Sequence, residues 1–166
     1  MPVPSPWVVQ WAGLVPPGAP VLDVAAGSGR HALFFDGRGH PVTAVDRDIS
    51  GLPRQDGIEP LAADLEGGSA WPLPGRTFGA VVVTNYLHRP LFPALLAALM
   101  PGGVLLYETF MVGNERFGRP SNPDFLLKDG ELLEVVRGHA SVVAYEARLV
   151  SEPRMAMVQR IAARQL

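Results

Sequence analysis

A short apolar run that ends in a Gly-x-Gly turn is the feature that most constrains this chain. Residues 20–25 are apolar apart from Asp23, Gly27 and Gly29 follow, and the stretch 30–38 can form a helix. A strand that passes into a helix across a glycine turn is typical of a doubly wound α/β sheet, because glycine permits positive φ and close approach of a ligand. Free N–H groups at the helix start favour polar or anionic ligand groups. The pattern therefore predicts a nucleotide-like cofactor at this turn.

Two cofactor classes fit the turn. Gly27, Gly29 and Ala32 match the G-x-G-x-x-A pattern of dinucleotide-binding turns. The next predicted strand, 41–46, ends in Asp46, which lies 19 residues after Gly27 (46 − 27). A carboxylate there would bind ribose hydroxyls of NAD or of S-adenosylmethionine (SAM), because both contain adenosine.

Three further features favour SAM. Asp23 lies beside the turn, where it would repel a pyrophosphate but could meet the methionine ammonium directly or through water. A third short predicted strand, 58–63, delivers Asp64 to the same edge, where it could accept a hydrogen bond from an adenine amino group. Pro101–Gly103 turns the chain from a predicted helix into a buried strand.

In this order, these segments resemble class I SAM-dependent methyltransferases over nearly the whole chain. The matching segments are 23–29, Asp46, Asp64, 84–86 after the fourth predicted strand, and 101–103. The stretches 113–123 and 125–132 are similar to small bacterial members, the second to the tellurite-resistance branch. The resemblance implies an α/β, doubly wound, Rossmann-like sheet of order 3-2-1-4-5-7-6 with the last strand antiparallel. The chain departs from the family at 47–57, where Gly51, Pro53 and Gly57 predict a short or broken second helix.

The cofactor site follows from these motifs. Asp46 is expected at the ribose, Asp64 at the adenine, and Arg30 at the methionine carboxylate. The full set that we expect to contact SAM is Asp23, Ala25, Gly27, Ser28, Gly29, Arg30, Asp46, Arg47, Asp64, Leu65 and Asn85.

The candidate catalytic residues follow the fourth and fifth predicted strands. We expect Asn85 and Tyr86 nearest the methyl group, although Tyr86 could equally be a wall of the pocket. His88 could accept a proton from the acceptor, or cap the next helix. Glu108, which ends a buried strand at the same edge, could orient the substrate or accept a hydrogen bond from the loop that follows. That loop, 111–125, is expected to act as a substrate lid.

The composition of the chain excludes several classes of protein. The 166 residues predict one domain, 1–166, and the absence of cysteine excludes disulfides and thiolate metal sites. No apolar run approaches the roughly 20 residues of a membrane span, and no His/Asp cluster has metal spacing. The first ten residues carry no Lys or Arg, so we expect no secretion signal and a cytoplasmic protein. The net charge of −2 gives no global footprint for nucleic acid, and no feature indicates an oligomeric state.

The leading function is therefore transfer of a methyl group from SAM to a small molecule, without a metal. An RNA or protein methyltransferase that works with a partner is the first alternative, because Arg116 and Arg119 could form a local basic patch. A non-catalytic module that binds SAM or another nucleotide, including NAD, is the second. The alternating stretch 142–150 and the following 155–163 predict a terminal antiparallel hairpin, which leaves no room for the sixth parallel strand of a dinucleotide dehydrogenase.

Overall fold

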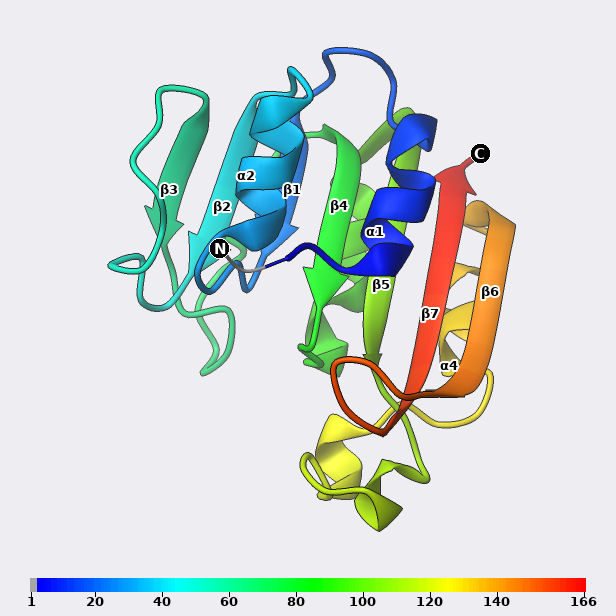
Figure 1. Ribbon diagram of the computed structural model, residues 1–166. Helices are drawn as coiled ribbons and strands as arrows, with labels where there is room; N and C mark the ends of the chain where they lie inside the picture. Colours follow the sequence, from blue (N-terminus) through cyan, green and yellow to red (C-terminus); the bar gives the residue numbers. More distant parts are fainter. Residues whose placement is uncertain (1–2) are drawn as a thin grey trace.

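The computed structural model describes residues 3–166 and contains one mixed sheet of seven strands (Figure 1). The strands run in the order β3-β2-β1-β4-β5-β7-β6. Their bounds are β1 Val21–Val24, β2 Val42–Asp46, β3 Ile58–Ala62, β4 Phe78–Thr84, β5 Leu99–Phe110, β6 Ala140–Val150 and β7 Ala156–Gln165. The first five strands pair in parallel, and β7 is antiparallel to both β5 and β6. The predicted strand order and terminal hairpin are confirmed.

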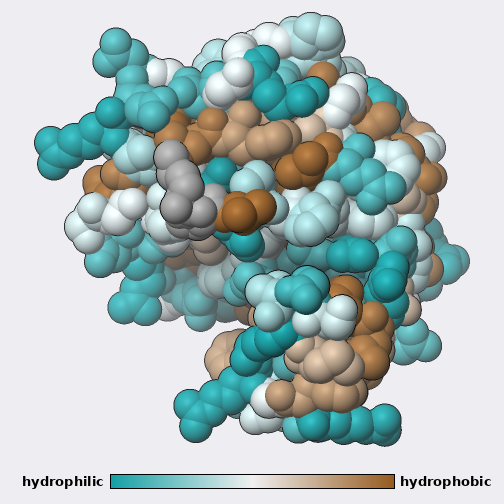
Figure 2. All heavy atoms as spheres, in the orientation of Figure 1, coloured by the Kyte–Doolittle hydropathy of each residue, from teal (hydrophilic) through white to brown (hydrophobic). Residues whose placement is uncertain are grey.

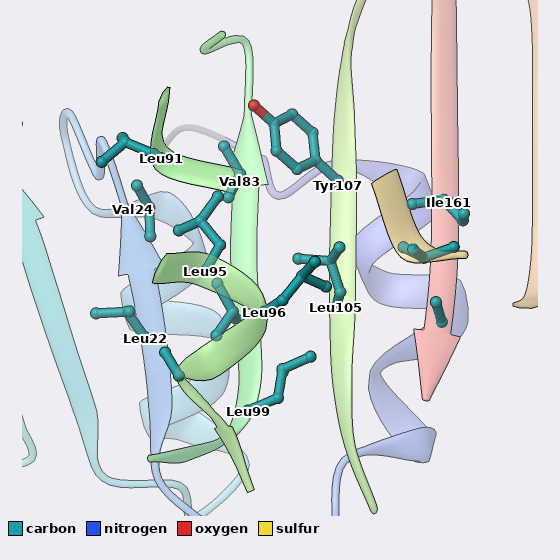
Figure 3. Close-up of a cluster of buried hydrophobic side chains, with 14 of the residues drawn as sticks. Leu22, Val24, Val83, Leu91, Leu95, Leu96, Leu99, Leu105, Tyr107 and Ile161 are labelled. Atoms are coloured by element: carbon teal, nitrogen blue, oxygen red, sulfur yellow. The ribbon is translucent and has the colours of Figure 1, made fainter. Parts of the chain in front are cut away.

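Helices cover both faces of the sheet. Their bounds are α1 Pro6–Trp11, α2 Arg30–Gly37, α3 Phe92–Ala97 and α4 Glu131–Val136. Helices α1 and α2 lie on the near face in Figure 1, while α3 and α4 lie behind. Figure 3 shows Leu95 and Leu96 of α3 packed over the strands, beside Leu105 of β5. No helix within residues 3–166 is long and apolar enough to cross a bilayer.

Local sequence explains the main elements. The first six residues of β4 are buried and apolar or glycine, as expected for a parallel strand with both faces covered. Helix α1 begins where Ser5 caps it, since the Ser5 hydroxyl accepts from the Trp7 N–H at 3.2 Å and Pro6 occupies the first helical position.

The sequence made specific predictions for two connections, and the structure agrees with the first and differs from the second. The segment 47–57 carries no helix, in agreement with its predicted interruption. Residues 101–103, expected as a turn before the fifth strand, lie inside β5, which already begins at Leu99. The extra residues are absorbed where the pairing with β4 shifts register between Phe78 and Ala80.

The parallel strands all end at the same edge of the sheet, at the bottom of Figure 1. The glycine turn 25–29 leaves β1 there, and the connections after β2, β3, β4 and β5 begin there. In open α/β sheets, ligands bind outside this edge, where the chain leaves neighbouring strands in opposite directions.

Candidate functional site

Two of the cavities at the carboxyl edge of the sheet lie beside the turns that follow β1 and β4. The first, of about 270 Å³, is lined by Ala25, Asp46, Arg47, Ala63, Asp64, Leu65, Glu66 and Tyr86. The second, of about 240 Å³, is bounded by the segment before α1, the ends of β4 and β5, and the β6–β7 connection. Ala25 and Asn85 follow the adjacent strands β1 and β4, and each lines one of the two cavities.

Ala25 and Asn85 share an unusual backbone conformation. Their φ angles are +54° and +55°, in the left-handed region that residues other than glycine rarely adopt. The Asn85 N–H is held by the carbonyl of Glu108 at 2.9 Å, which fixes this turn against β5. Strained residues of this kind concentrate at functional sites, where the surrounding structure enforces them.

The glycine turn needs its glycines for two different reasons. Gly27 and Gly29 have φ angles of +57° and +81°. A Cβ on Gly29 would also lie 2.6 Å from the Pro53 side chain, because the connection after β2 packs across the turn. A Cβ on Gly27 meets no described protein atom within 4 Å. The exposed crest of the turn, Gly27 and Ser28, is therefore open to a ligand.

Asp46 ties the second strand to the glycine turn. Its carboxylate accepts the Gly27 N–H at 2.9 Å and the Asp48 N–H at 3.1 Å, one on each oxygen. A carboxylate has about four acceptor positions, so each oxygen keeps one for a further donor. The group faces the first cavity, and the arrangement fits a ribose with two adjacent hydroxyls.

The rest of the first cavity comes from the connections that follow β2, β3 and β4. Arg47, Asp64 and Leu65, three members of the set expected to contact SAM, line it, and their contact with a cofactor stays a prediction. Glu66 also lines it, and accepts the Tyr86 hydroxyl at 3.0 Å. Burial, followed by the hydrogen bond to Glu66, raises the pKa of Tyr86 well above its usual value. Glu66 was missed because it falls in a Gly-rich loop without a pattern.

Asp23 is buried beneath the turn and lines neither cavity. Its Oδ2 accepts the Ala32 N–H of α2 at 3.1 Å. Burial raises the pKa of Asp23 to about 7, although the Ala32 hydrogen bond and the nearby Arg30 charge lower it in part. Its observed partner is thus the first turn of α2, and a contact with a methionine ammonium stays a prediction.

Three of the predicted site residues line the second cavity. Arg30 and Asn85 were expected to contact SAM, and Glu108 was a candidate catalytic residue. Glu108 is not free: Oε1 accepts the Ser5 hydroxyl at 2.7 Å and Oε2 accepts from Arg160 at 2.8 Å. The hydrogen bond from the loop after β5, one of the two expected roles, is replaced by these partners from the N-terminal segment and β7.

The segment before α1 is tied to the site at three points. The Ser5 N–H donates to the His31 Nε2 at 3.0 Å, the Ser5 hydroxyl donates to Glu108, and the Val3 carbonyl accepts from Arg30 at 3.0 Å. Burial, and then the Arg30 charge, lower the pKa of His31 to about 4, so the ring is neutral at pH 7. The sequence gives no local sign of these three contacts, because their partners lie 26 to 103 residues apart in the chain.

His88 does not reach the second cavity. It lines a separate hollow beside Trp71 and Pro90, and its Nδ1 lies 3.7 Å from the Glu66 Oε1. His88 occupies the N-cap position of the 3-10 helix Arg89–Leu91, as the alternative expected, but its side chain makes no capping hydrogen bond there. A role for His88 as proton acceptor stays a prediction.

The loop 111–125 is ordered by contacts of its own. The buried Asn114 donates to the Pro120 carbonyl at 2.9 Å and accepts the Met157 N–H at 3.0 Å. Neither Phe117 nor Arg119 lines the second cavity. The loop forms a lobe that stands out from the body of the molecule (Figure 2). The cavity is walled instead by the segment before α1 and by the β6–β7 connection, so the lid role of the loop stays a prediction.

Arg89 fastens this lobe to the sheet. Its guanidinium contacts both carboxylate oxygens of Glu131, at 2.7 and 2.9 Å, and donates to the carbonyls of Leu126 and Asp124. The sequence contained no local sign of these contacts, because Glu131 lies 42 residues further along the chain.

Known proteins resemble the chain in sequence and in fold. No family model matches it. Over 95 residues, 52% of the chain, it is 36% identical to a ribosomal protein L11 methyltransferase from Thermus thermophilus, and it spans 37% of that protein's length. TehB from Haemophilus influenzae superposes with a TM-score of 0.76 at 19% identity, over 96% of this chain and 61% of that one.

A third relative was crystallised with ligands. The 1,6-didemethyltoxoflavin-N1-methyltransferase of Burkholderia thailandensis, with bound 1,6-didemethyltoxoflavin and S-adenosylhomocysteine, superposes with a TM-score of 0.65 at 22% identity. The match covers 96% of this chain and 76% of that one. Strand order and structural similarity together give the chain the fold of the class I SAM-dependent methyltransferases.

Proposed function

We propose that this protein is a SAM-dependent methyltransferase that acts on a small molecule. The observation that carries the proposal is the ring of acidic side chains, Asp46, Asp64 and Glu66, around a cavity that opens beside the glycine turn. The similarity to a methyltransferase crystallised with S-adenosylhomocysteine supports it.

In this proposal the first cavity holds the adenosine part of SAM. Asp46 accepts the ribose hydroxyls with the lone pairs that Gly27 and Asp48 leave free. Asp64 accepts from the adenine amino group, beside the Leu65 side chain. Arg30, at the start of α2, faces the methionine carboxylate, and charge-assisted bonds of this type are among the strongest in proteins.

The second cavity holds the methyl acceptor, with Asn85 at the border between the two. When bound, SAM supplies an electrophilic methyl group on a sulfonium, so the acceptor's lone pair forms the new bond while the sulfur keeps the old bonding pair. The contribution of the protein is alignment of the acceptor and exclusion of water. Glu108 holds the wall of the second cavity in position, because one of its oxygens accepts from Ser5 and the other from Arg160.

Calorimetry with SAM, S-adenosylhomocysteine and NAD tests the cofactor assignment. We expect saturable heats for the first two ligands and none for NAD. Binding of NAD without binding of SAM would overturn the proposal. Because this titration needs no acceptor, its result is independent of the acceptor's identity.

A protein acceptor is the second candidate function. The 36% identity to a ribosomal protein L11 methyltransferase favours it. Incubation with SAM that carries a labelled methyl group, followed by separation of proteins from small molecules, distinguishes the two. Label in purified ribosomal proteins would support this candidate, whereas label confined to the small-molecule fraction of a cell extract would support the first.

A further inference from the structure

The charged side chains of the second cavity divide into a paired set and an unpaired set. Glu108 and Arg160 are 2.8 Å apart, and Arg160 is also 2.8 Å from Glu146. The Arg160 guanidinium lies over the Trp7 ring, 5.1 Å from its centroid. Of these groups only Glu108 and Arg160 line the cavity, and their charges cancel, so the pair contributes shape to the cavity and little free charge.

Arg154 belongs to the unpaired set. It lies on the β6–β7 connection, where it donates to the Arg119 carbonyl, and its guanidinium is 5.9 Å from the Phe110 ring centroid. Within residues 3–166 the ion pairs include no carboxylate partner for Arg154 or for Arg30. A guanidinium has five N–H donors. Because Arg154 uses one side of the group on a backbone carbonyl, most of its donors are available to a ligand.

The remaining lining of the cavity is largely apolar. Pro6, Phe110, Val150, Pro153, Ala156 and Val158 form these walls. The other carboxylate, Glu152, stands on the exposed β6–β7 connection. The charged side chains of the lining outside the Glu108–Arg160 pair are therefore Arg30, Arg154 and Glu152. The volume of about 240 Å³ is sufficient for a compact organic molecule.

We propose that the second cavity selects a small organic anion as methyl acceptor, with Arg154 holding its carboxylate or comparable oxyanion and Phe110 and Pro153 contacting its apolar body. The inference rests on the proposed function, in which Arg30 is directed to the methionine carboxylate of SAM. Arg154 then remains as the cation that the cofactor does not use. Planar guanidinium groups bind planar oxyanions through two parallel hydrogen bonds, which fixes orientation as well as charge.

Binding of three probes to the protein saturated with S-adenosylhomocysteine tests this inference. Benzoate carries the charge and the ring, benzamide keeps the ring without the charge, and acetate keeps the charge without the ring. We expect benzoate to bind at least fivefold more tightly than either of the others, measured by NMR titration of the backbone amides of Phe110 and Ala156. Arg154→Gln should abolish the preference for benzoate over benzamide.

Arg148→Gln is the matched control. Arg148 lies on β6 of the same hairpin, is 3.8 Å from Glu146 and does not line the cavity, so its loss should leave the preference unchanged. Equal affinity for benzoate and benzamide, no binding of benzoate, or an unchanged preference in Arg154→Gln would overturn the inference. Acetate that binds as tightly as benzoate would overturn the role of the apolar wall. Failure of S-adenosylhomocysteine to bind would instead count against the proposed function.

Discussion

The backbone N–H of Ser5 donates a hydrogen bond to the Nε2 of His31, 3.0 Å away and 26 residues further along the chain. The bond joins the segment before α1 to the first turn of α2, which begins at the glycine turn. It requires an imidazole without a proton on Nε2, and therefore a neutral His31.

His31 makes the stability of the protein sensitive to acid. Its folded pKa of about 4 lies below the ordinary value of 6.5, so the unfolded chain binds the proton more tightly. The free energy of unfolding contributed by His31 is complete above pH 6.5 and is lost as the pH falls towards 4, by roughly 3 kcal/mol. We expect His31→Gln, whose amide oxygen can accept the Ser5 N–H, to remove this contribution. Urea unfolding at pH 7 and pH 4.5 measures it; an identical pH dependence in the variant would contradict the assignment.

Asp23 has the opposite effect. Its folded pKa of about 7 lies above the ordinary value of 3.8, so its contribution to stability is complete below pH 3.8 and is lost as the pH rises through 7. Asp23→Asn keeps an oxygen for the Ala32 N–H and removes the buried charge. We expect the stability of this variant relative to wild type to increase by roughly 3 kcal/mol between pH 4.5 and pH 8 in urea unfolding. If the difference in unfolding free energy between the variant and wild type stays constant across that range, burial does not destabilise the charged form of Asp23.

Substitution of Asp46 tests whether its carboxylate binds the ribose of SAM. Asp46→Ala should weaken SAM binding by about 1.5–3 kcal/mol, the range for hydrogen bonds to a charged group, measured by calorimetry. The fold should survive, because the carboxylate lies at a strand end and, within residues 3–166, bonds only to the backbone of Gly27 and Asp48. Asp56→Ala is the control, since Asp56 is exposed and does not line the first cavity. Unchanged affinity in a folded Asp46→Ala protein would refute the assignment.

Substitutions of Gly29 and Gly27 by alanine distinguish the effect of a steric clash on stability from that of an unfavourable backbone conformation. Gly29→Ala adds a clash with Pro53 to an unfavourable φ of +81°, whereas Gly27→Ala adds only the cost of a φ of +57°. We expect Gly27→Ala to lose about 1 kcal/mol of unfolding free energy and Gly29→Ala at least twice as much. Thermal or urea unfolding of the two variants makes the comparison. Equal losses would mean that the connection after β2 can move aside.

Gly27 also bears on the cofactor. A Cβ added at Gly27 meets no described protein atom within 4 Å, so a Gly27→Val side chain would extend into the space beside the turn. We expect this variant to bind SAM more weakly than wild type, which a calorimetric titration of the variant tests; unchanged affinity would show that the cofactor does not approach Gly27.

The sequence by itself determined the strands of the sheet, and its resemblance to class I SAM-dependent methyltransferases implied their order. The apolar run of β4, the glycine turn after β1 and the alternation within β6 each depend on a few consecutive residues, so their periodicity and turn chemistry identify them. The acids at strand ends were found for the same reason. Asp46 and Asp64 are placed at one cavity by the common direction of the parallel strands, which the strand assignments already imply.

Only the tertiary structure decided which side chains meet across the sheet. Ser5 and Glu108 are 103 residues apart, and Arg160 reaches Glu108 because β7 enters the sheet beside β5. The wall of the second cavity on the β6–β7 connection and the burial of His31 were decided in the same way. No local pattern encodes such pairs, because their free energy depends on packing, burial and the exact positions of distant backbone segments, whereas strand and turn preferences are set by neighbouring residues.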